Sequence, residues 1–411
     1  MKNNFIVGID IGTKKISTII GQVKTEEDVD EIEVIGYGVS ESNGIKRGVI
    51  VDMNKTVEDI KKSVKEAELT AGVEVESAYI NISGSHIQSI SAKGSINITG
   101  GKHREITRDD VDRAVTHGSS IMLPNNKDIL HVLPQEFIID SQEDIKNPIG
   151  MTGSSLEVYI LIVTAAKAAT RNLLICLKKA KIDVLKMTLS HIATAEAVLT
   201  ADEKELGVAL VDIGGGTTDF AIYEKGALKY SSTIGVGGFN FTNDLAIGTR
   251  TPIDKAEIIK RKYGSGMDPN LKNQNIEIPS VGGKKMRMIN ASLLTDILKP
   301  RAEEIFEMVK NKIEQEGLEN KINAGIVLTG GTAQLDGLLE IADEIFSAPV
   351  RVGKPYGVGG LIDKVNTPDF STALGLIKYG LMDMRNRGVM PDSSTGLFQK
   401  IKNKFTDLLG F

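Results

Sequence analysis

Two aspartates and three glycine-rich turns are the parts of this sequence whose types and spacing could do chemistry together. Asp10 and Asp212 each end an apolar run and stand directly before a turn of glycine and threonine. Backbone N–H groups in such a turn approach phosphate oxygens closely, because glycine has no β-carbon and accepts positive φ. The three turns are Gly12-Thr13, Gly214-Gly215-Gly216-Thr217 and Gly330-Gly331-Thr332. Together they predict a phosphate-binding site, although any one of them alone is as typical of a tight hairpin.

The two aspartates add a candidate metal site to these turns. Mg²⁺ keeps most of its waters in proteins and bridges phosphate oxygens, so Asp10 and Asp212 at matching positions could hold a hydrated ion. The alternative is that both carboxylates cap their own turns. Other turn side chains that could contact phosphate are the hydroxyls of Thr13, Thr217 and Thr218 and the amine of Lys14 or Lys15.

The elements that carry the first two turns are repeated. In each copy a strand leads to the aspartate and a second strand follows the turn, at residues 16–21 and 219–223, which is the pattern of a hairpin. The two copies begin about half the chain length apart. An internal duplication of this size predicts an α/β protein built of two similar halves that face each other.

Breaks in the pattern divide the halves further. Glycines punctuate short alternating runs from residue 84, and Thr251-Pro252 is a strong helix start in the second half. Two glycines, a proline and several hydroxyl residues near the end have the composition of a linker. We therefore predict a first half over 1–200 with an inserted subdomain at 84–150, a second half over 201–385 with an inserted subdomain at 242–300, a flexible linker at 386–396 and a helix at 397–411.

The last segment is amphipathic when it is drawn as a helix. Its apolar face consists of Leu397, Phe398, Ile401, Phe405, Leu408 and Leu409, and the flanking residues are Lys402 and Lys404. Lysine stems can rest on apolar material while their amines meet lipid phosphates, so this segment predicts an anchor at an anionic membrane surface. The alternative is a helix that packs on the protein's own core or on a partner helix.

The composition excludes several classes of protein. The chain has 411 residues, of which 25% are charged and 41% hydrophobic, with a formal net charge of −5. These values are those of a folded globular protein and leave no global positive field for nucleic acid, which we do not expect as a partner. The longest apolar run, residues 158–166, is too short to cross a bilayer as a helix. Cys176 is the single cysteine, so no internal disulfide can form, and we expect a reducing compartment.

The three turns and their flanks resemble known motifs. Residues 9–13, 212–219 and 328–331 are similar to the phosphate-1, phosphate-2 and adenosine motifs of the actin, Hsp70 and sugar-kinase superfamily. Within it the chain resembles the FtsA family of bacterial cell-division proteins, from the first hairpin to the last residue. The likeness is carried by segments 205–208, 278–283 and 324–331 and by the position of the first insertion. The resemblance implies a duplicated actin-like (ribonuclease H-like) fold with an inserted subdomain in each half and a C-terminal amphipathic helix.

The resemblance also implies that ATP and Mg²⁺ bind between the halves. It places nucleotide-binding positions at Asp10, Gly12, Thr13, Asp212, Gly214, Gly215, Gly216, Thr217, Gly330, Gly331 and Thr332, and the turns themselves add Lys14 and Thr218. Glu257 and Lys260 match the segment that covers the adenosine and would contact ribose or base; the alternative is an i, i+3 surface ion pair.

Hydrolysis needs a residue that activates water. Glu196 is the only acid on the helix before the second motif, where the superfamily would have such a residue, and the alternative is that it is merely solvated. We therefore expect ATP binding with at most slow hydrolysis.

The function implied by the resemblance is that of a polymer at the cytoplasmic side of the cell membrane, peripheral and at the division site. Such a polymer anchors FtsZ, and thus the Z ring, and helps to assemble the division machinery. Arg301 and Glu304 are the candidate FtsZ contact, with a solvated helix face as the alternative. The alternatives left open are a small-molecule kinase of the same superfamily and another membrane-bound actin-like protein, including a pilus-assembly protein. An Hsp70-like chaperone would lack room for a substrate domain after Met384, and the position of the first insertion argues against an MreB-like filament protein.

Overall fold

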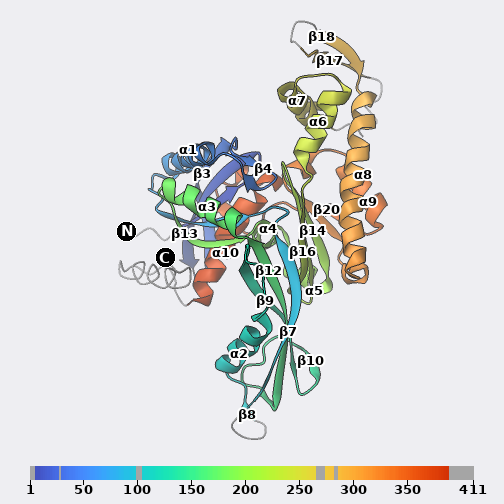
Figure 1. The fold of residues 1–411 in the computed structure, drawn as a ribbon. Helices are drawn as coiled ribbons and strands as arrows, with labels where there is room; N and C mark the ends of the chain where they lie inside the picture. The colour runs from blue at the N-terminus through green and yellow to red at the C-terminus, as the bar shows by residue number, and fades with distance from the viewer. Residues whose placement is uncertain (1–4, 27–28, 99–103, 265–273, 282–285, 388–411) are drawn as a thin grey trace.

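Two mixed sheets form the centres of the two halves in the computed structural model, which describes residues 5–26, 29–98, 104–264, 274–281 and 286–387 (Figure 1). The first sheet has the order β13 (Asp183–Leu189), β6 (Ser77–Ile82), β1 (Phe5–Ile11), β2 (Lys15–Glu26), β3 (Val29–Glu41) and β21 (Gly359–Gly360). The second has the order β16 (Ala227–Ile234), β15 (Thr218–Glu224), β14 (Val208–Ile213), β19 (Ile326–Thr329) and β20 (Val350–Val352).

The central strands of the two sheets share one layout. β1 pairs antiparallel with β2 and parallel with β6, and β14 pairs antiparallel with β15 and parallel with β19. Asp10 lies opposite Ser17 in the first hairpin, and Asp212 lies opposite Asp219 in the second. The predicted duplication and the α/β class are therefore confirmed, and each candidate aspartate stands at the same place in its half.

Helices cover both faces of the first sheet. On β1, Val7 and Ile9 pack in the cluster that holds α1 and α3, whereas Ile6 packs in the cluster that holds α10. Gly8 lets α10 approach closely, because a Cβ there would lie 2.8 Å from Leu376 Cβ. The helices of this half are α1 (Met53–Ala71), α3 (Lys167–Lys179), α4 (Ser190–Val198) and α10 (Ser371–Asn386). A short hairpin, β4 (Ile45–Lys46) and β5 (Val49–Ile50), precedes α1.

The inserted subdomain of the first half is larger than the predicted range 84–150. Its four-stranded sheet has the order β10-β9-β12-β7, and β12 pairs with both β7 and β9. The apolar run in β12 reads like a strand of the main sheet, but β12 pairs within the inserted sheet. Val158, Ile160 and Ile162 pack in the core of the subdomain, whereas Leu161 and Val163 pack in the core cluster of the first half. Its elements are β7 (Gln88–Asn97), β8 (Arg104–Glu105), α2 (Arg108–Ser119), β9 (Lys127–Ile139), β10 (Gln142–Ile145), β11 (Thr152–Gly153) and β12 (Ser155–Ala166).

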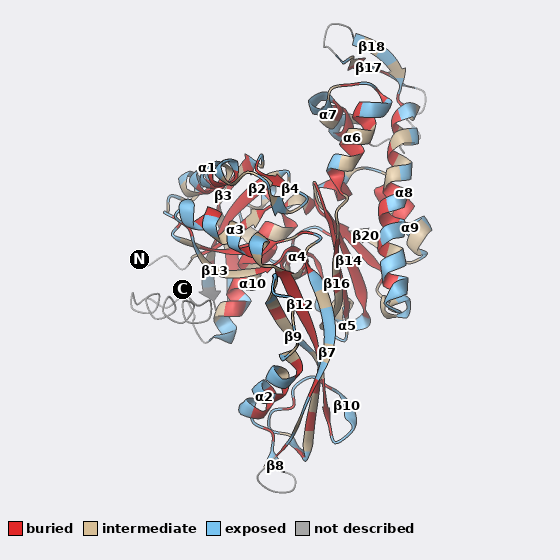
Figure 2. Ribbon diagram, viewed as in Figure 1, coloured by how far each residue is buried: buried red, intermediate tan, exposed pale blue. Residues whose placement is uncertain are grey.

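Helices and a hairpin extend the second half away from its sheet, opposite the first inserted subdomain in the view of Figure 1. Figure 2 shows that buried residues concentrate in the two sheets and on the inner sides of the helices. The extending elements are α6 (Gly238–Gly248), α7 (Ile253–Tyr263), β17 (Asn275–Pro279), β18 (Met286–Asn290) and the start of α8 (Ser292–Gln315), whereas α5 (Ala201–Leu206) and α9 (Leu338–Phe346) lie beside the sheet (Figure 1).

The C-terminal predictions lie almost wholly outside the described residues. α10 ends at Asn386, and description of the chain ends at Arg387, before most of the predicted linker. The candidate membrane residues Leu397, Phe398, Ile401, Lys402, Lys404, Phe405, Leu408 and Leu409 are all beyond this point. Among the helices that are described, none is long and apolar enough to cross a membrane.

Candidate functional site

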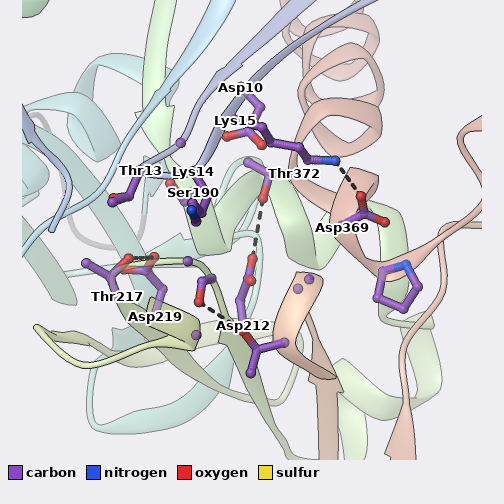
Figure 3. Close-up of a pocket in the computed structure, with 18 of the residues that line it drawn as sticks. Asp10, Thr13, Lys14, Lys15, Ser190, Asp212, Thr217, Asp219, Asp369 and Thr372 are labelled. Carbon is purple, nitrogen blue, oxygen red and sulfur yellow. Dashed lines mark hydrogen bonds and ion pairs between the residues drawn. The ribbon is translucent and has the colours of Figure 1, made fainter. Parts of the chain in front are cut away.

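The turns after β1 and β14 face each other across a cleft of about 540 Å³ between the two halves (Figure 3). Both turns close in the same way: the Gly12 N–H donates to the Lys15 carbonyl at 3.1 Å, and the Gly214 N–H donates to the Thr217 carbonyl at 2.9 Å. The repeated local sequence thus gives a repeated turn. The strands behind the turns place them at opposite walls of one cavity.

The two turns approach so closely that glycine is required. A Cβ on Gly216 would lie 2.6 Å from Thr13 Cγ2, and a Cβ on Gly215 would lie 2.7 Å from Lys14 Cβ. Real side chains do not tolerate such distances without a shift of the backbone. The glycines therefore serve the contact between the halves as well as access to the backbone N–H groups.

Three carboxylates gather at the floor of the cleft. Burial raises the pKa of Asp10 to about 6, although Lys15 and the Asn81 amide favour its ionised form. Burial and the neighbouring Asp219 raise the pKa of Asp212 to about 7. Burial also raises the pKa of Asp219. Carboxylates that are crowded and desolvated in this way gain from a bound cation, because a cation favours the ionised form of each.

Hydroxyl and amide donors from four other elements hold these carboxylates in place. Asn81, at the end of β6, donates from Nδ2 to Asp10 Oδ1 at 2.7 Å. Thr194 of α4 and Thr372 of α10 donate to Asp212 Oδ2 at 3.0 and 3.3 Å. Two further donors hold Asp219, namely the Ser83 hydroxyl at 2.7 Å and the Thr233 hydroxyl at 2.5 Å.

Sequence reasoning missed Asn81, Ser83 and Thr372 as site residues. Asn81 and Ser83 do carry a signal, because they are polar residues at and just after the carboxyl end of a strand, which here lies parallel to β1. Thr372 carries no such signal in the sequence, because its hydroxyl bonds Asp212 across 160 positions of the chain.

The third turn completes the cleft on the side of the second half. Gly330 has φ of 86°, and a Cβ there would lie 2.3 Å from Asp212 Oδ1 and 2.7 Å from the Ile213 carbonyl oxygen. Thr332 is buried and donates its hydroxyl to the Gly214 carbonyl at 3.2 Å. The turn is thereby tied to the turn that follows β14.

Glu257 and Lys260 of α7 form an i, i+3 pair at the cleft wall, in which Lys260 is buried and Glu257 is partly buried. Lys260 Nζ donates to Glu257 Oε2 at 2.8 Å, to the Thr242 hydroxyl at 2.9 Å and to the Gly238 carbonyl at 2.9 Å. Burial works to raise the pKa of Glu257, but Lys260 outweighs it and lowers that pKa to about 2. Burial lowers the pKa of Lys260. The i, i+3 ion pair of the alternative is therefore present, but it lines the cleft and its lysine is buried.

The two lysines after the first turn differ in their surroundings. Lys15 Nζ pairs with Asp369 Oδ2 at 2.5 Å and lies 3.6 Å from the centre of the Phe370 ring, so its charge is already engaged. Lys14 lines the cleft against Gly215 and has no ion pair among the described residues. Lys14 is therefore the lysine whose charge is available to a ligand.

Most predicted nucleotide positions line this one cleft. They are Asp10, Gly12, Thr13, Lys14, Asp212, Gly214, Gly215, Thr217, Glu257, Lys260, Gly330, Gly331 and Thr332. Two predicted residues do not line it. Gly216 packs on Thr13, and Thr218 is fully buried and donates to the Val236 carbonyl at 2.9 Å, so its hydroxyl serves the second hairpin.

Glu196 is not brought to the cleft. It lies on α4, but its carboxylate accepts from Lys204 Nζ at 2.8 Å, and Glu196 is not among the residues that line the cavity. The first residue of α4, Ser190, does line the cavity, and its hydroxyl accepts from Asn81 Nδ2 at 2.9 Å. The end of α4 that faces the cleft thus presents a hydroxyl and no carboxylate.

Arg301 and Glu304 lie together on α8. Arg301 binds Asp244 of α6 through Nε at 2.6 Å and through a second nitrogen at 3.2 Å, and it also pairs with Glu304. The Arg301 side chain is 23% exposed and that of Glu304 is 49% exposed. Arg301 therefore ties α8 to α6, and Glu304 is the more accessible of the two.

The arrangement is suited to a phosphate ester and a hydrated cation. Backbone N–H groups of glycine turns, threonine hydroxyls and Lys14 can meet phosphate oxygens from both halves. In the described ranges no group of three or more His, Cys, Asp or Glu side chains is placed to ligate a metal directly. Mg²⁺ fits such a site, because it keeps several waters and needs only one or two carboxylates besides the phosphates.

Comparison with solved structures gives the fold. The structure is similar to a PilM–PilN type IV pilus biogenesis complex, with a TM-score of 0.66 and 16% identity over 92% of this chain and 98% of that one. It is also similar to MreB5 of Spiroplasma citri bound to ADP, with a TM-score of 0.55 and 15% identity over 94% of this chain and 97% of that one. Both likenesses place the chain in the actin-like fold class.

Comparison with sequences gives the family. A family model described as cell division protein FtsA matches residues 209–375, and a model described as the SHS2 domain inserted in FtsA matches residues 84–164. The chain is 40% identical to the cell division protein FtsA of Pseudomonas aeruginosa over 92% of this chain and 89% of that one. It is 35% identical to FtsA of Escherichia coli K12 over 91% of this chain and 90% of that one. The chain therefore belongs to the FtsA family of cell division proteins.

Proposed function

We propose that the cleft binds ATP together with Mg²⁺ and that this division protein uses the nucleotide to hold its two halves in one arrangement. The observation that carries the proposal is the pair of facing turns, in which Gly216 lies against Thr13 and three carboxylates crowd the floor between them. The phosphates would lie between the turns, with Mg²⁺ held through water by Asp10 and Asp212. The ion would neutralise carboxylate and phosphate charge at the point where the halves meet.

The nucleoside would lie toward α7. Glu257 and Lys260 are held by the hydrogen bonds described above, so Glu257 is an ionised acceptor for ribose hydroxyls and the Lys260 stem is a rigid wall. Gly331 and Thr332 border the same part of the cleft from the third turn. With the nucleoside beside α7, the phosphates would lie at the two hairpin turns. A single ATP molecule would then span the whole cavity.

Turnover is proposed to be slow. General-base catalysis of hydrolysis needs an acceptor within hydrogen-bond reach of the attacking water. The candidate Glu196 is paired with Lys204, and Ser190 stands at the cleft end of its helix. The ligand is therefore proposed to act as a clamp between the halves, and the small-molecule kinase alternative receives no support from the relatives.

The membrane and FtsZ parts of the proposal rest on the family and on the terminal segment. Residues 397–411 would lie on the cytoplasmic face of the cell membrane at the division site, and many copies in a polymer would make weak single contacts firm. FtsZ would meet the exposed side of α8, where Glu304 is accessible and Arg301 keeps α8 against α6. In this way the Z ring would be anchored to the membrane.

The test is vesicle co-sedimentation of the full chain and of a chain ending at Asn386, each with and without ATP and Mg²⁺ and with FtsZ present or absent. We expect the full chain to pellet far more strongly than the shorter chain and to carry FtsZ with it. Substitution of Glu304 by Lys should weaken FtsZ recruitment while vesicle binding stays the same. Equal pelleting of both chains would overturn the terminal anchor, and pelleting without FtsZ would overturn the tether.

A further inference from the structure

α3 carries a face of cations that no acid of the same helix balances. Arg171, Lys178 and Lys179 are exposed together with Ile175, whose exposed fraction is 43%, and we call these four residues the basic face of α3. Their spacing of four, three and one residues puts them on one side of the helix. Lys181 extends the face into the next turn and is also exposed.

The cations of this face are unengaged. Across the described ranges, none of Arg171, Lys178 and Lys179 forms an ion pair, and α3 contains no Asp or Glu. On the neighbouring helix α1, by contrast, lysines alternate with glutamates, and Lys65 pairs with Glu68 at 3.5 Å. An exposed isoleucine among uncompensated cations is typical of a surface that meets an anionic and partly apolar partner.

By the edge of the first sheet we mean the end at which β1, β6 and β13 begin. The basic face of α3 reaches this edge, and α10, the helix before the C-terminal segment, ends there too. α3 ends at Lys179, and β13 begins at Asp183, whose N–H donates to the Glu76 carbonyl just before β6 at 2.8 Å. β13 and β6 are parallel, and β6 is parallel to β1, so the three strands begin at one edge. The cationic end of α3 therefore lies at this edge.

α10 runs to the same edge. It is antiparallel to β1, because a Cβ on Gly8 would meet Leu376 whereas a Cβ on Gly380, one turn later, would meet Ile6. Near its end Asp383 accepts from Lys186 of β13 at 2.7 Å and from the Tyr79 hydroxyl of β6 at 3.2 Å. Residues 388–411 thus follow a chain end that is fixed beside β13, the strand that α3 precedes.

We propose that the basic face of α3 is a second membrane contact that binds anionic lipid headgroups beside the C-terminal segment. The inference rests on the proposed function for the presence of a membrane at this edge, and it adds a site on the folded body. Guanidinium and ammonium groups would pair with lipid phosphates, and Ile175 would lie among them at the headgroup level. The protein's own terminal segment is a poor occupant, because residues 397–411 carry three lysines and one aspartate and are cationic themselves.

Acidic groups at the same edge determine which side of the protein can approach the membrane. Glu74, Glu76 and Asp183 are exposed near the starts of β6 and β13. The exposed Glu31 of β3 lies four strands from β13, which is about 19 Å at the usual spacing of strands. That distance exceeds the Debye length of about 8 Å at physiological salt, so Glu31 is largely screened from lipids under α3. The contact is expected to tilt the α3 side toward the membrane.

The experiment compares two variants of the full chain with equal changes in net charge. One replaces Arg171, Lys178 and Lys179 by Gln; the control replaces Lys255, Lys262 and Lys312 by Gln, which are exposed cations of the second half. Binding is measured on vesicles of phosphatidylcholine alone and of phosphatidylcholine with phosphatidylglycerol. Thermal melting of each variant shows that the fold is kept.

The α3 variant is expected to bind the vesicles with phosphatidylglycerol at least about tenfold more weakly than the wild type, since each cation near such a surface contributes severalfold. The control should stay within about twofold, and raised salt should shrink the difference. An equal loss of vesicle binding in both variants would show that only the net charge of the protein matters, and it would overturn the inference. Unchanged binding of the α3 variant would overturn it too and would leave the face to an acidic protein.

A chain ending at Asn386 separates this inference from the proposed anchor. Residual binding of that chain to anionic vesicles that disappears with the α3 substitutions would support the face even where the terminal segment fails. Binding of the full chain that ignores both lipid charge and the α3 substitutions would support the terminal anchor alone. Failure of the full chain to bind any vesicle would overturn both.

Discussion

Asn81 ties three elements of the first half together beside the cleft, because its Nδ2 donates to Asp10 Oδ1 at 2.7 Å and to the Ser190 hydroxyl at 2.9 Å. Its Oδ1 accepts from the Ile11 N–H at 2.7 Å. One buried amide on β6 thus sets the position of the Asp10 carboxylate, the turn after β1 and the start of α4.

Substitution of Asn81 by Ala should therefore weaken the binding of ATP with Mg²⁺ by about tenfold, since hydrogen bonds to charged groups contribute roughly 1.5–3 kcal/mol. Titration calorimetry measures the effect. The control is Asn43→Ala, because Asn43 also bonds a carboxylate, that of Asp59, but at an exposed site on the outside of the first half. An affinity that Asn81→Ala leaves unchanged would contradict the assignment of Asp10 to the metal.

The raised pKa of Asp212 predicts an opposition between stability and ligand binding. Its pKa is about 7 in the folded protein against 3.8 as the ordinary value, so the folded state binds more protons between these values. The ligand-free protein should then gain stability from this group as the pH falls below about 7 and lose it as the pH rises. Binding of Mg²⁺ with ATP has the reverse dependence, because the ion needs the ionised carboxylate.

Asp212→Asn is the variant that isolates this effect. At about pH 8 the ligand-free variant should melt at a higher temperature than the wild type, because an uncompensated buried charge is gone. The increase in Tm on addition of ATP and Mg²⁺ should largely disappear in the variant. A variant that is less stable than the wild type at this pH, or that keeps the full ligand shift, would speak against Asp212 as a metal carboxylate.

Gly330 and Gly72 allow a steric prediction with a matched control. Both have φ near 70–90°, where alanine is strained, but a Cβ on Gly330 would lie 2.3 Å from Asp212 Oδ1 whereas a Cβ on Gly72 would meet nothing within 4 Å. Gly72→Ala should cost about 1 kcal/mol of unfolding free energy and leave ATP affinity unchanged. Gly330→Ala should abolish measurable ATP binding at ligand concentrations that saturate the wild type. Equal ATP affinities in the two variants would show that the third turn does not border the ligand.

Glu196 supplies a prediction about turnover. If its carboxylate only pairs with Lys204, Glu196→Gln should leave the proposed slow hydrolysis of ATP within about twofold of the wild-type rate and should lower stability by less than about 1 kcal/mol. A single-turnover assay with radiolabelled ATP measures the rate, and Lys204→Met is the control that removes the pair from its other side. A tenfold fall in rate with Glu196→Gln alone would restore Glu196 as the water-activating residue.

The sequence predicts the parts of this protein that depend on local pattern. Both hairpins with their aspartates and the helix that starts after Thr251-Pro252 follow from short-range rules. The extent of the first insertion does not, because the apolar run of β12 fits a strand of either sheet and only its partners decide between them.

Local pattern predicted the glycine turns and the aspartates before them, and the family resemblance added Glu257 and Lys260 on α7. The side chains that orient the carboxylates reach them through tertiary contact, as Lys15 reaches Asp369 across 354 positions of the chain. Thr218 was assigned to the cleft by its place in a motif and Glu196 by its place on a helix. The Thr218 hydroxyl instead bonds the Val236 carbonyl, and the Glu196 carboxylate instead accepts from Lys204. A motif match identifies a residue but does not say which way its side chain points.

Equilibrium binding of ATP to the full chain, measured by titration calorimetry with Mg²⁺ and again with the Mg²⁺ chelated, tests the central claim most directly. The account predicts one ATP per chain, an affinity that falls at least about tenfold without Mg²⁺, and loss of this Mg²⁺ dependence when Asp10 and Asp212 are both replaced by Asn. Absence of ATP binding to the wild type, or binding that ignores both Mg²⁺ and the two aspartates, would contradict it.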